Sequence, residues 1–103
     1  MSNVIVIDMI GRINVGAFNE MFNKSEPVFS HSTGKSFFDA RVFNNLLLVY
    51  EIQYYCKEYG IRNDLSAVLD IIQRKLDKNT ILVSFRKDEE MCENIYHYVF
   101  LLK

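Results

Sequence analysis

Residues 30 to 36 read Ser-His-Ser-Thr-Gly-Lys-Ser and end in the last three letters of a phosphate-binding loop. Such a loop also needs a glycine five positions before the second one, a preceding strand and a following helix. That position is Phe29, whose side chain opposes the tight turn that gathers several amides around one phosphate. We therefore expect Gly34 to turn the chain and Ser36 to cap a helix, without a bound nucleotide or other cofactor.

His31 and His97 are the only histidines of the chain. Two histidines can cleave RNA by acid-base catalysis without a metal ion, which makes a small ribonuclease an alternative hypothesis. Nothing in their spacing places them together, so we expect no catalytic residues and no enzyme. Cys56 and Cys92 lack the spacing of a metal or redox site and are interpreted as reduced thiols.

The charge balance narrows the classes of partner. Twelve basic and thirteen acidic residues give a net charge of −1, which lacks the basic excess typical of nucleic-acid binding. The first residues lack a cationic signal segment, and no apolar stretch approaches the ~20 residues that span a bilayer. We therefore expect a cytoplasmic protein without nucleic-acid or membrane partners.

Two separate features remain as candidate partner-binding sites, namely an acidic segment and the tyrosines of a long predicted helix. Carboxylates at the rim of an interface attract a basic partner over a long range and speed its association. Tyrosine is a residue type enriched in the cores of interfaces. The predicted partner-binding residues are Asp88, Glu89, Glu90, Glu93, Tyr50 and Tyr55.

The elements that must position these residues follow from the apolar patterns. The 103 residues are interpreted as one domain. Strands are expected over Val4 to Met9, Thr80 to Arg86 and Ile95 to Leu102, with a short extended piece at Val28 and Phe29. Helices are expected over 17–23, over Phe37 to Tyr59 between Ser36 and Gly60, and over Asp64 to Lys78 after the cap Asn63. The segment 88–94 would join the last two strands as a hairpin, although residues 91–102 also show helical spacing.

This order predicts an α+β fold, a two-layer sandwich in which the helices pack on one face of a three- to four-stranded mixed sheet. The long helix over 37–59 would carry more apolar surface than one small sheet covers. It would then be enclosed in the core or meet another chain, so a homodimer through this helix is a further possibility.

The sequence therefore favours a protein-binding module. Our preferred hypothesis is an immunity protein or inhibitor, of bacterial or phage type, that covers the site of a basic toxin or nuclease domain. The alternatives are the ribonuclease that uses His31 and His97 and a homo-oligomeric structural subunit built on the long helix.

Overall fold

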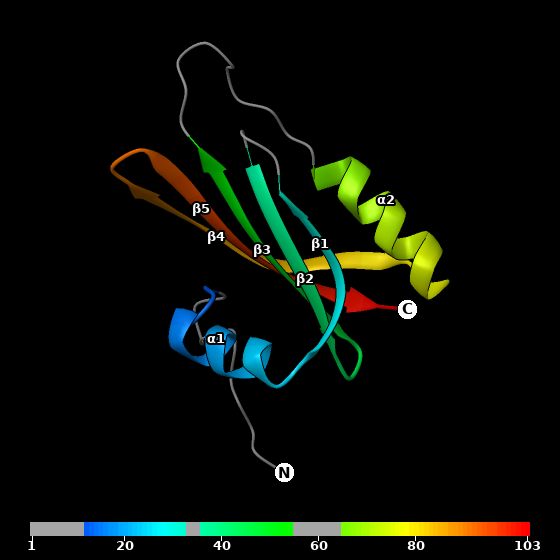
Figure 1. The fold of residues 1–103 in the computed structure, drawn as a ribbon. Coiled ribbons are helices and arrows are strands. Elements are labelled where there is room, and N and C mark those ends of the chain that lie inside the picture. Colours follow the sequence, from blue (N-terminus) through cyan, green and yellow to red (C-terminus); the bar gives the residue numbers. More distant parts are fainter. Residues whose placement is uncertain (1–11, 33–35, 55–64) are drawn as a thin grey trace.

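A computed structural model describes residues 12–32, 36–54 and 65–103. Two helices and five strands follow one another along the chain (Figure 1). Their bounds are α1 Val15–Asn23, β1 Glu26–Ser32, β2 Ser36–Phe43, β3 Leu46–Tyr54, α2 Leu65–Leu76, β4 Thr80–Glu90 and β5 Glu93–Leu102.

The five strands form one antiparallel sheet in the order β1-β2-β3-β5-β4. Two of the connections are two-residue turns. Asn44 begins the turn between β2 and β3 and adopts a left-handed conformation with φ of 54°, which asparagine tolerates better than most residues. Met91 and Cys92 form the turn between β4 and β5.

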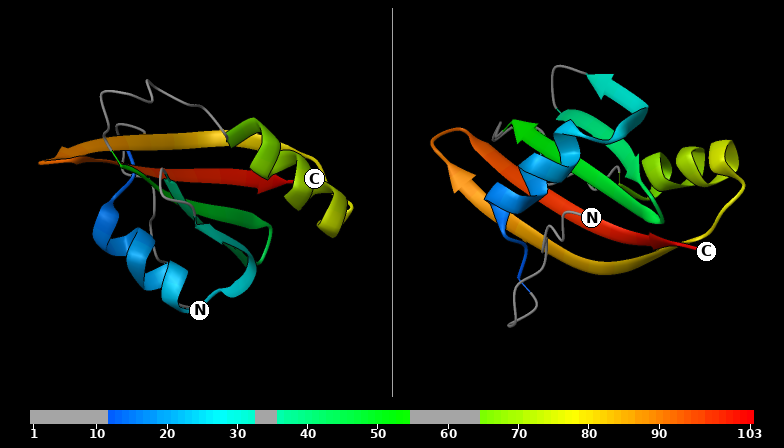
Figure 2. Two further views of the ribbon diagram at one scale, coloured as in Figure 1. Left: turned by 45° about the horizontal axis from the view of Figure 1, so that its top comes forward. Right: turned by 90° about the horizontal axis from the view of Figure 1, so that it is seen from below.

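The helices lie on opposite faces of the sheet (Figure 2). The apolar stripe of α2 covers one face, where Val68 and Ile72 pack against alternate residues of β2, β3 and β5. The buried sheet residues in this cluster are Phe38, Ala40, Leu47, Val49, Tyr98, Phe100 and Leu102. Helix α1 covers the other face with Phe18 and Met21, which pack with Ile13 against Leu48 and Val99.

Helix α1 begins at a side-chain cap and ends against the sheet. The Asn14 side-chain oxygen accepts a hydrogen bond from the Ala17 amide at 3.0 Å, which satisfies one of the free donors of the first turn. After the last turn, the Ser25 hydroxyl donates to the Met21 carbonyl at 2.6 Å. The chain then enters β1 at the edge of the sheet, and α1 is held over the face that it covers.

The predicted fold class is wrong in its layers and in its sheet. The helices lie on both faces rather than one, and the sheet has five antiparallel strands rather than three or four mixed ones. The main error is the helix predicted over 37–59, because residues 36–54 form β2, the turn at Asn44 and β3. Strand β3 is central and covered on both sides, so its apolar residues show no clear two-residue alternation.

Other expectations are confirmed. The helices predicted over 17–23 and 64–78 correspond to α1 and α2, and the extended piece at Val28 and Phe29 belongs to β1. The last two predicted strands are β4 and β5, joined as a hairpin, so residues 93–102 are strand rather than helix. The strand predicted over 4–9, the cap Asn63 and the stop Gly60 lie outside the described residues.

Candidate functional site

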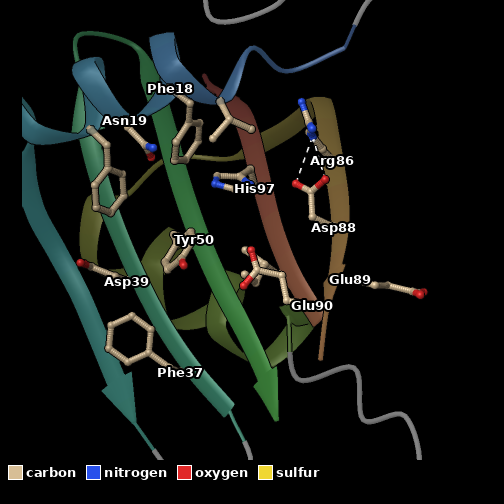
Figure 3. Close-up of a pocket in the computed structure, with 13 residues that line it drawn as sticks. Phe18, Asn19, Phe37, Asp39, Tyr50, Arg86, Asp88, Glu89, Glu90 and His97 are labelled. Atoms are coloured by element: carbon tan, nitrogen blue, oxygen red, sulfur yellow. Dashed lines mark hydrogen bonds and ion pairs between the residues drawn. The ribbon is translucent and has the colours of Figure 1, made fainter. Parts of the chain in front are cut away.

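A pocket of about 760 Å³ opens on the face of the sheet that α1 covers (Figure 3). Helix α1 forms one wall with Phe18 and Phe22, and strands β2, β3 and β5 form the floor. The end of β4 forms the opposite wall with Arg86, Asp88 and Glu90. This volume lies within the range of about 300–1,000 Å³ that is typical of ligand-binding pockets.

The strand register aligns one row of polar and aromatic side chains across the floor. Asp39 of β2 lies opposite Tyr50 of β3, Tyr50 lies opposite His97 of β5, and His97 lies opposite Arg86 of β4. Directly opposite residues of antiparallel strands share a face, so the four side chains form one continuous row under α1. The site is therefore assembled from two hairpins, β2–β3 and β4–β5, that are far apart in the sequence.

His97 lies at the centre of this row and is 4% exposed. The Phe18 ring meets it edge-on at 4.8 Å between centroids, and the Tyr50 ring lies at 5.2 Å. Burial lowers the pKa of His97 from its ordinary value; the negative charge of Asp88 opposes this shift, and the positive charge of Arg86 adds to it. The imidazole is therefore neutral at pH 7, and its Nδ1 has no hydrogen-bond partner within the described part of the chain.

The carboxylates at the rim fall into two groups. Asp88 accepts hydrogen bonds from the Arg86 Nε at 3.1 and 3.0 Å, and Glu89 pairs with Lys87 at 3.4 Å. Glu90 and Glu93 lie directly opposite each other across the hairpin. Neither forms an ion pair with another residue in the ranges 12–32, 36–54 and 65–103. Like charges directly opposite each other are destabilising. A cation bound beside these two carboxylates would relieve their repulsion.

Tyr50 connects the rim to the floor. Burial raises the pKa of its phenol, and the nearby negative charges of Glu93 and Glu90 raise it further. The phenol therefore stays protonated at pH 7 and can donate a hydrogen bond. Its ring is half-buried, with Phe37 on one side and His97 on the other. Aromatic faces beneath unpaired carboxylates suit a planar cation, which can stack on a ring and donate to an oxygen.

The predicted partner-binding residues are only partly brought together. Asp88, Glu90 and Tyr50 line the pocket, and Glu93 lies beside Glu90. Glu89 also borders the pocket, but its carboxylate points away from it in Figure 3 and is paired with Lys87. Tyr55 lies outside the described residues.

The structure does not bring the two histidines together. His31 lies opposite Phe38 in the sheet, on the face that α2 covers, whereas His97 lies under α1. Strands β2 and β3 separate their strands in the sheet. The two side chains therefore cannot act on one substrate group from these positions.

The phosphate-loop fragment joins two strands. Ser32 ends β1 and Ser36 begins β2, and the two strands pair as neighbours. Residues 33–35 lie outside the described ranges. A phosphate-binding loop opens a helix, and the chain from Ser36 to Phe43 is a strand. The predicted capping role of Ser36 is therefore wrong, because no helix begins there.

Sequence reasoning missed the roles of Phe18, Asp39 and His97 in the pocket. Asp39 lies in the segment that was predicted to be a helix, and His97 was considered only as half of a catalytic histidine pair. One signal was present in the sequence. Successive side chains of a strand point to opposite faces, so within Tyr96-His97-Tyr98 the histidine had to face one side of the sheet and the two tyrosines the other.

A second buried polar cluster lies on the opposite face. The Glu51 carboxylate is 1% exposed and accepts hydrogen bonds from the Tyr98 hydroxyl and the Gln53 amide, both at 2.9 Å. Burial, followed by the charge and the hydrogen bond of Glu51, raises the pKa of Tyr98 far above its ordinary range. Because the carboxylate is buried and hydrogen-bonded by these neighbours, we interpret the cluster as a structural network.

The described residues contain neither a cluster of metal ligands nor a membrane-spanning helix. No group of three histidine, cysteine, aspartate or glutamate side chains there could hold a metal ion. No helix in the described ranges is long and apolar enough to cross a bilayer.

With the fold and the pocket defined, comparison with protein-family models, curated proteins and solved structures gave no match.

Proposed function

We propose that the chain is a non-catalytic, cytoplasmic protein-binding module that inhibits a basic partner by covering its site, as immunity proteins do. The pocket under α1 would receive an arginine side chain of that partner. The observation that carries the proposal is the unpaired Glu90–Glu93 couple at the rim of an aromatic floor. A guanidinium group pairs with carboxylates through a planar fork and stacks on aromatic rings, which a lysine ammonium does less well.

Two features of the pocket and two of the hairpin tip support this proposal. Its volume of about 760 Å³ exceeds a single side chain, so it would accommodate an arginine with neighbouring residues of the partner. The buried Nδ1 of His97 is unsatisfied by the described residues, although buried polar atoms are almost always hydrogen-bonded. Met91, at the tip of the hairpin next to the rim, is fully exposed and offers a flexible apolar contact. The free thiol of Cys92 suits a reducing compartment.

The first test uses a defined probe rather than an unknown partner. A short peptide with one arginine is titrated into the protein, and the ring signals of Tyr50 and His97 are followed by NMR. The matched control is the same peptide with citrulline, which keeps the shape and removes the charge. We expect saturable shifts with arginine only, and their loss in the Glu90→Gln, Glu93→Gln double variant.

The variant Glu89→Gln is the control for the protein, because Glu89 borders the pocket but its carboxylate points away from it and is paired with Lys87. It should bind the arginine peptide as the wild type does. Equal binding of the citrulline peptide, or no binding of either peptide, would contradict an arginine-binding pocket.

The second test concerns a partner identified by capture and mass spectrometry. Carboxylates at the rim affect mainly the rate of association, since their attraction for a basic partner is long-ranged and weakened by salt. The double variant of Glu90 and Glu93 should therefore associate several-fold more slowly at low salt and equally fast at high salt. Tyr50→Ala should mainly accelerate dissociation, because an anchor on the pocket floor acts in the formed complex. Association that is independent of salt in the wild type would refute electrostatic steering.

A further inference from the structure

His97 is a buried titratable group of the pocket. Its side chain is 4% exposed and lines the pocket beneath α1. Its Nδ1 atom has no hydrogen-bond partner in the described part of the chain, although buried polar atoms are almost always hydrogen-bonded. Histidine is also the side chain that ordinarily changes its charge between pH 5 and 8. A proton bound at His97 would therefore change the charge inside the pocket.

The groups around His97 offer little compensation for a positive charge. From β3 the Tyr50 ring lies against the imidazole at 5.2 Å between centroids, and from α1 the Phe18 ring lies at 4.8 Å. From β4 the imidazole meets Arg86, directly opposite, and the charge of Asp88, which the Arg86 Nε already engages at 3.1 and 3.0 Å. The side chains of α1 that line the pocket are uncharged, namely Val15, Phe18, Asn19 and Phe22. A proton on His97 would thus add a second cation directly opposite Arg86.

The proposed arginine site lies close enough to His97 for the two charges to interact. Cations that stack on an aromatic ring lie within about 6 Å of its centroid. A guanidinium between the Tyr50 ring and Glu90 would therefore be at most about 11 Å from the centre of the His97 ring. Two unit charges at that distance in water change each other's binding about twofold, and more in the lower dielectric of a partly buried pocket. Asp39, the other carboxylate of the floor, lies opposite Tyr50 on the side away from His97.

We propose that His97 makes the binding of arginine in this pocket dependent on pH, because the neutral imidazole permits binding and the protonated imidazole opposes it. This regulation rests on the arginine site proposed above. Burial lowers the pKa of His97, so the affinity is full above the ordinary value of 6.5 and is lost as the pH falls through the lowered value. By reciprocity, a bound arginine decreases the proton affinity of His97 by the same factor. A partner held through this pocket would be released by acidification.

An NMR pH titration of the ring protons of both histidines, without and with a saturating amount of the arginine peptide, tests the proposal. We expect the peptide to lower the titration midpoint of His97 by at least about 0.3 pH units at low salt, which corresponds to a twofold effect. His31 is the internal control, because it lies on the face that α2 covers, and its midpoint should not move. A His97 midpoint that the peptide leaves unchanged or raises overturns the proposal. A His97 that stays neutral as long as the protein is folded overturns it as well.

The dissociation constant of the same peptide is then measured at pH 7 and below the His97 midpoint. It should increase on acidification by the factor that the shift of the midpoint requires, which is tenfold for each pH unit. This step should be absent in His97→Gln, which cannot be protonated, and present in the control His31→Gln. An equal step in His97→Gln would show that other groups of the pocket carry the pH dependence and would overturn the role of His97. Binding with the same affinity at both pH values overturns the regulation and leaves the arginine site standing, whereas no binding at any pH overturns both.

Discussion

Replacing Glu90 with glutamine should stabilise the free protein while it weakens the binding of a cation. Glu90 and Glu93 lie directly opposite each other at the end of the β4–β5 hairpin, and no ion pair of the described residues compensates either charge. Removing one of the two charges relieves their repulsion in the unbound state. The same change removes half of the attraction that we propose for an arginine side chain. A residue that costs stability but improves binding is typical of a functional site.

The size of the gain follows from the geometry of the pair. Directly opposite side chains have Cβ atoms about 5 Å apart, and two unit charges at that distance in water repel by about 0.8 kcal/mol. At physiological ionic strength the Debye length is about 8 Å, which reduces the repulsion by roughly half. We therefore expect Glu90→Gln to raise the free energy of unfolding by about 0.8 kcal/mol at low salt and by about 0.4 kcal/mol at physiological salt.

Urea unfolding at pH 7, at low and at high salt, measures this difference. Glu89→Gln is the matched control, because it removes the same charge from the same strand but breaks the exposed pair with Lys87 at 3.4 Å. Exposed pairs contribute about 0–1 kcal/mol, so this variant should be neutral or slightly less stable. The gain in Glu90→Gln should vanish at high salt, where the repulsion between the two carboxylates is screened. The reasoning is refuted if Glu90→Gln is destabilised, or if both variants respond to salt in the same way.

Three further predictions concern the fold around the pocket and the buried network. Tyr98→Phe removes the hydroxyl that donates to the buried Glu51 carboxylate, so it should lose about 1–3 kcal/mol in urea unfolding; a neutral result would show that this hydrogen bond is replaceable. The pKa of His97 is lowered in the folded state, so its neutral form contributes stability that is present above its ordinary value of 6.5 and is lost as the pH falls below it. Thermal melts of wild type and His97→Phe should therefore diverge with pH in that acidic range, and parallel curves would contradict the assignment. Asn44→Ala places a β-carbon without a polar group at φ of 54° and should destabilise the β2–β3 turn, whereas Asn44→Gly should not; equal melting temperatures of the two variants would argue against the left-handed turn.

Local patterns in the sequence were sufficient to predict four of the elements, namely α1, α2, β4 and β5. Helix α2 was predicted because its apolar residues from Leu65 to Leu76 recur at the helical period, and such a stripe needs only one apolar surface to pack against. Strands β4 and β5 were predicted from β-branched and aromatic residues on both sides of an acidic segment. Helix α1 was expected from the spacing of Phe18, Met21 and Phe22.

The segment 36–54 could not be assigned in the same way. A strand that is buried on both faces and a helix that is buried all round are both nearly continuous apolar runs, and periodicity does not separate them. What decides between them is whether neighbouring strands are available on both sides, and these neighbours, β5 above all, are supplied by residues 93–102. A local signal at Asn44 and Asn45 pointed to a turn, but it was weaker than the apolar run around it.

The sequence by itself determined the acidic character of the candidate site, because an acidic segment predicts a basic partner wherever that segment lies. Only the tertiary structure decided which of these residues act together. The row of Asp39, Tyr50, His97 and Arg86 exists because the registers of three strand pairs bring distant residues to one face. The same registers separate His31 from His97 and turn Glu89 away from Glu90. They also place β4 at one edge of the described sheet. Strand register depends on pairing between distant segments, and a one-residue shift would move every side chain of a strand to the other face.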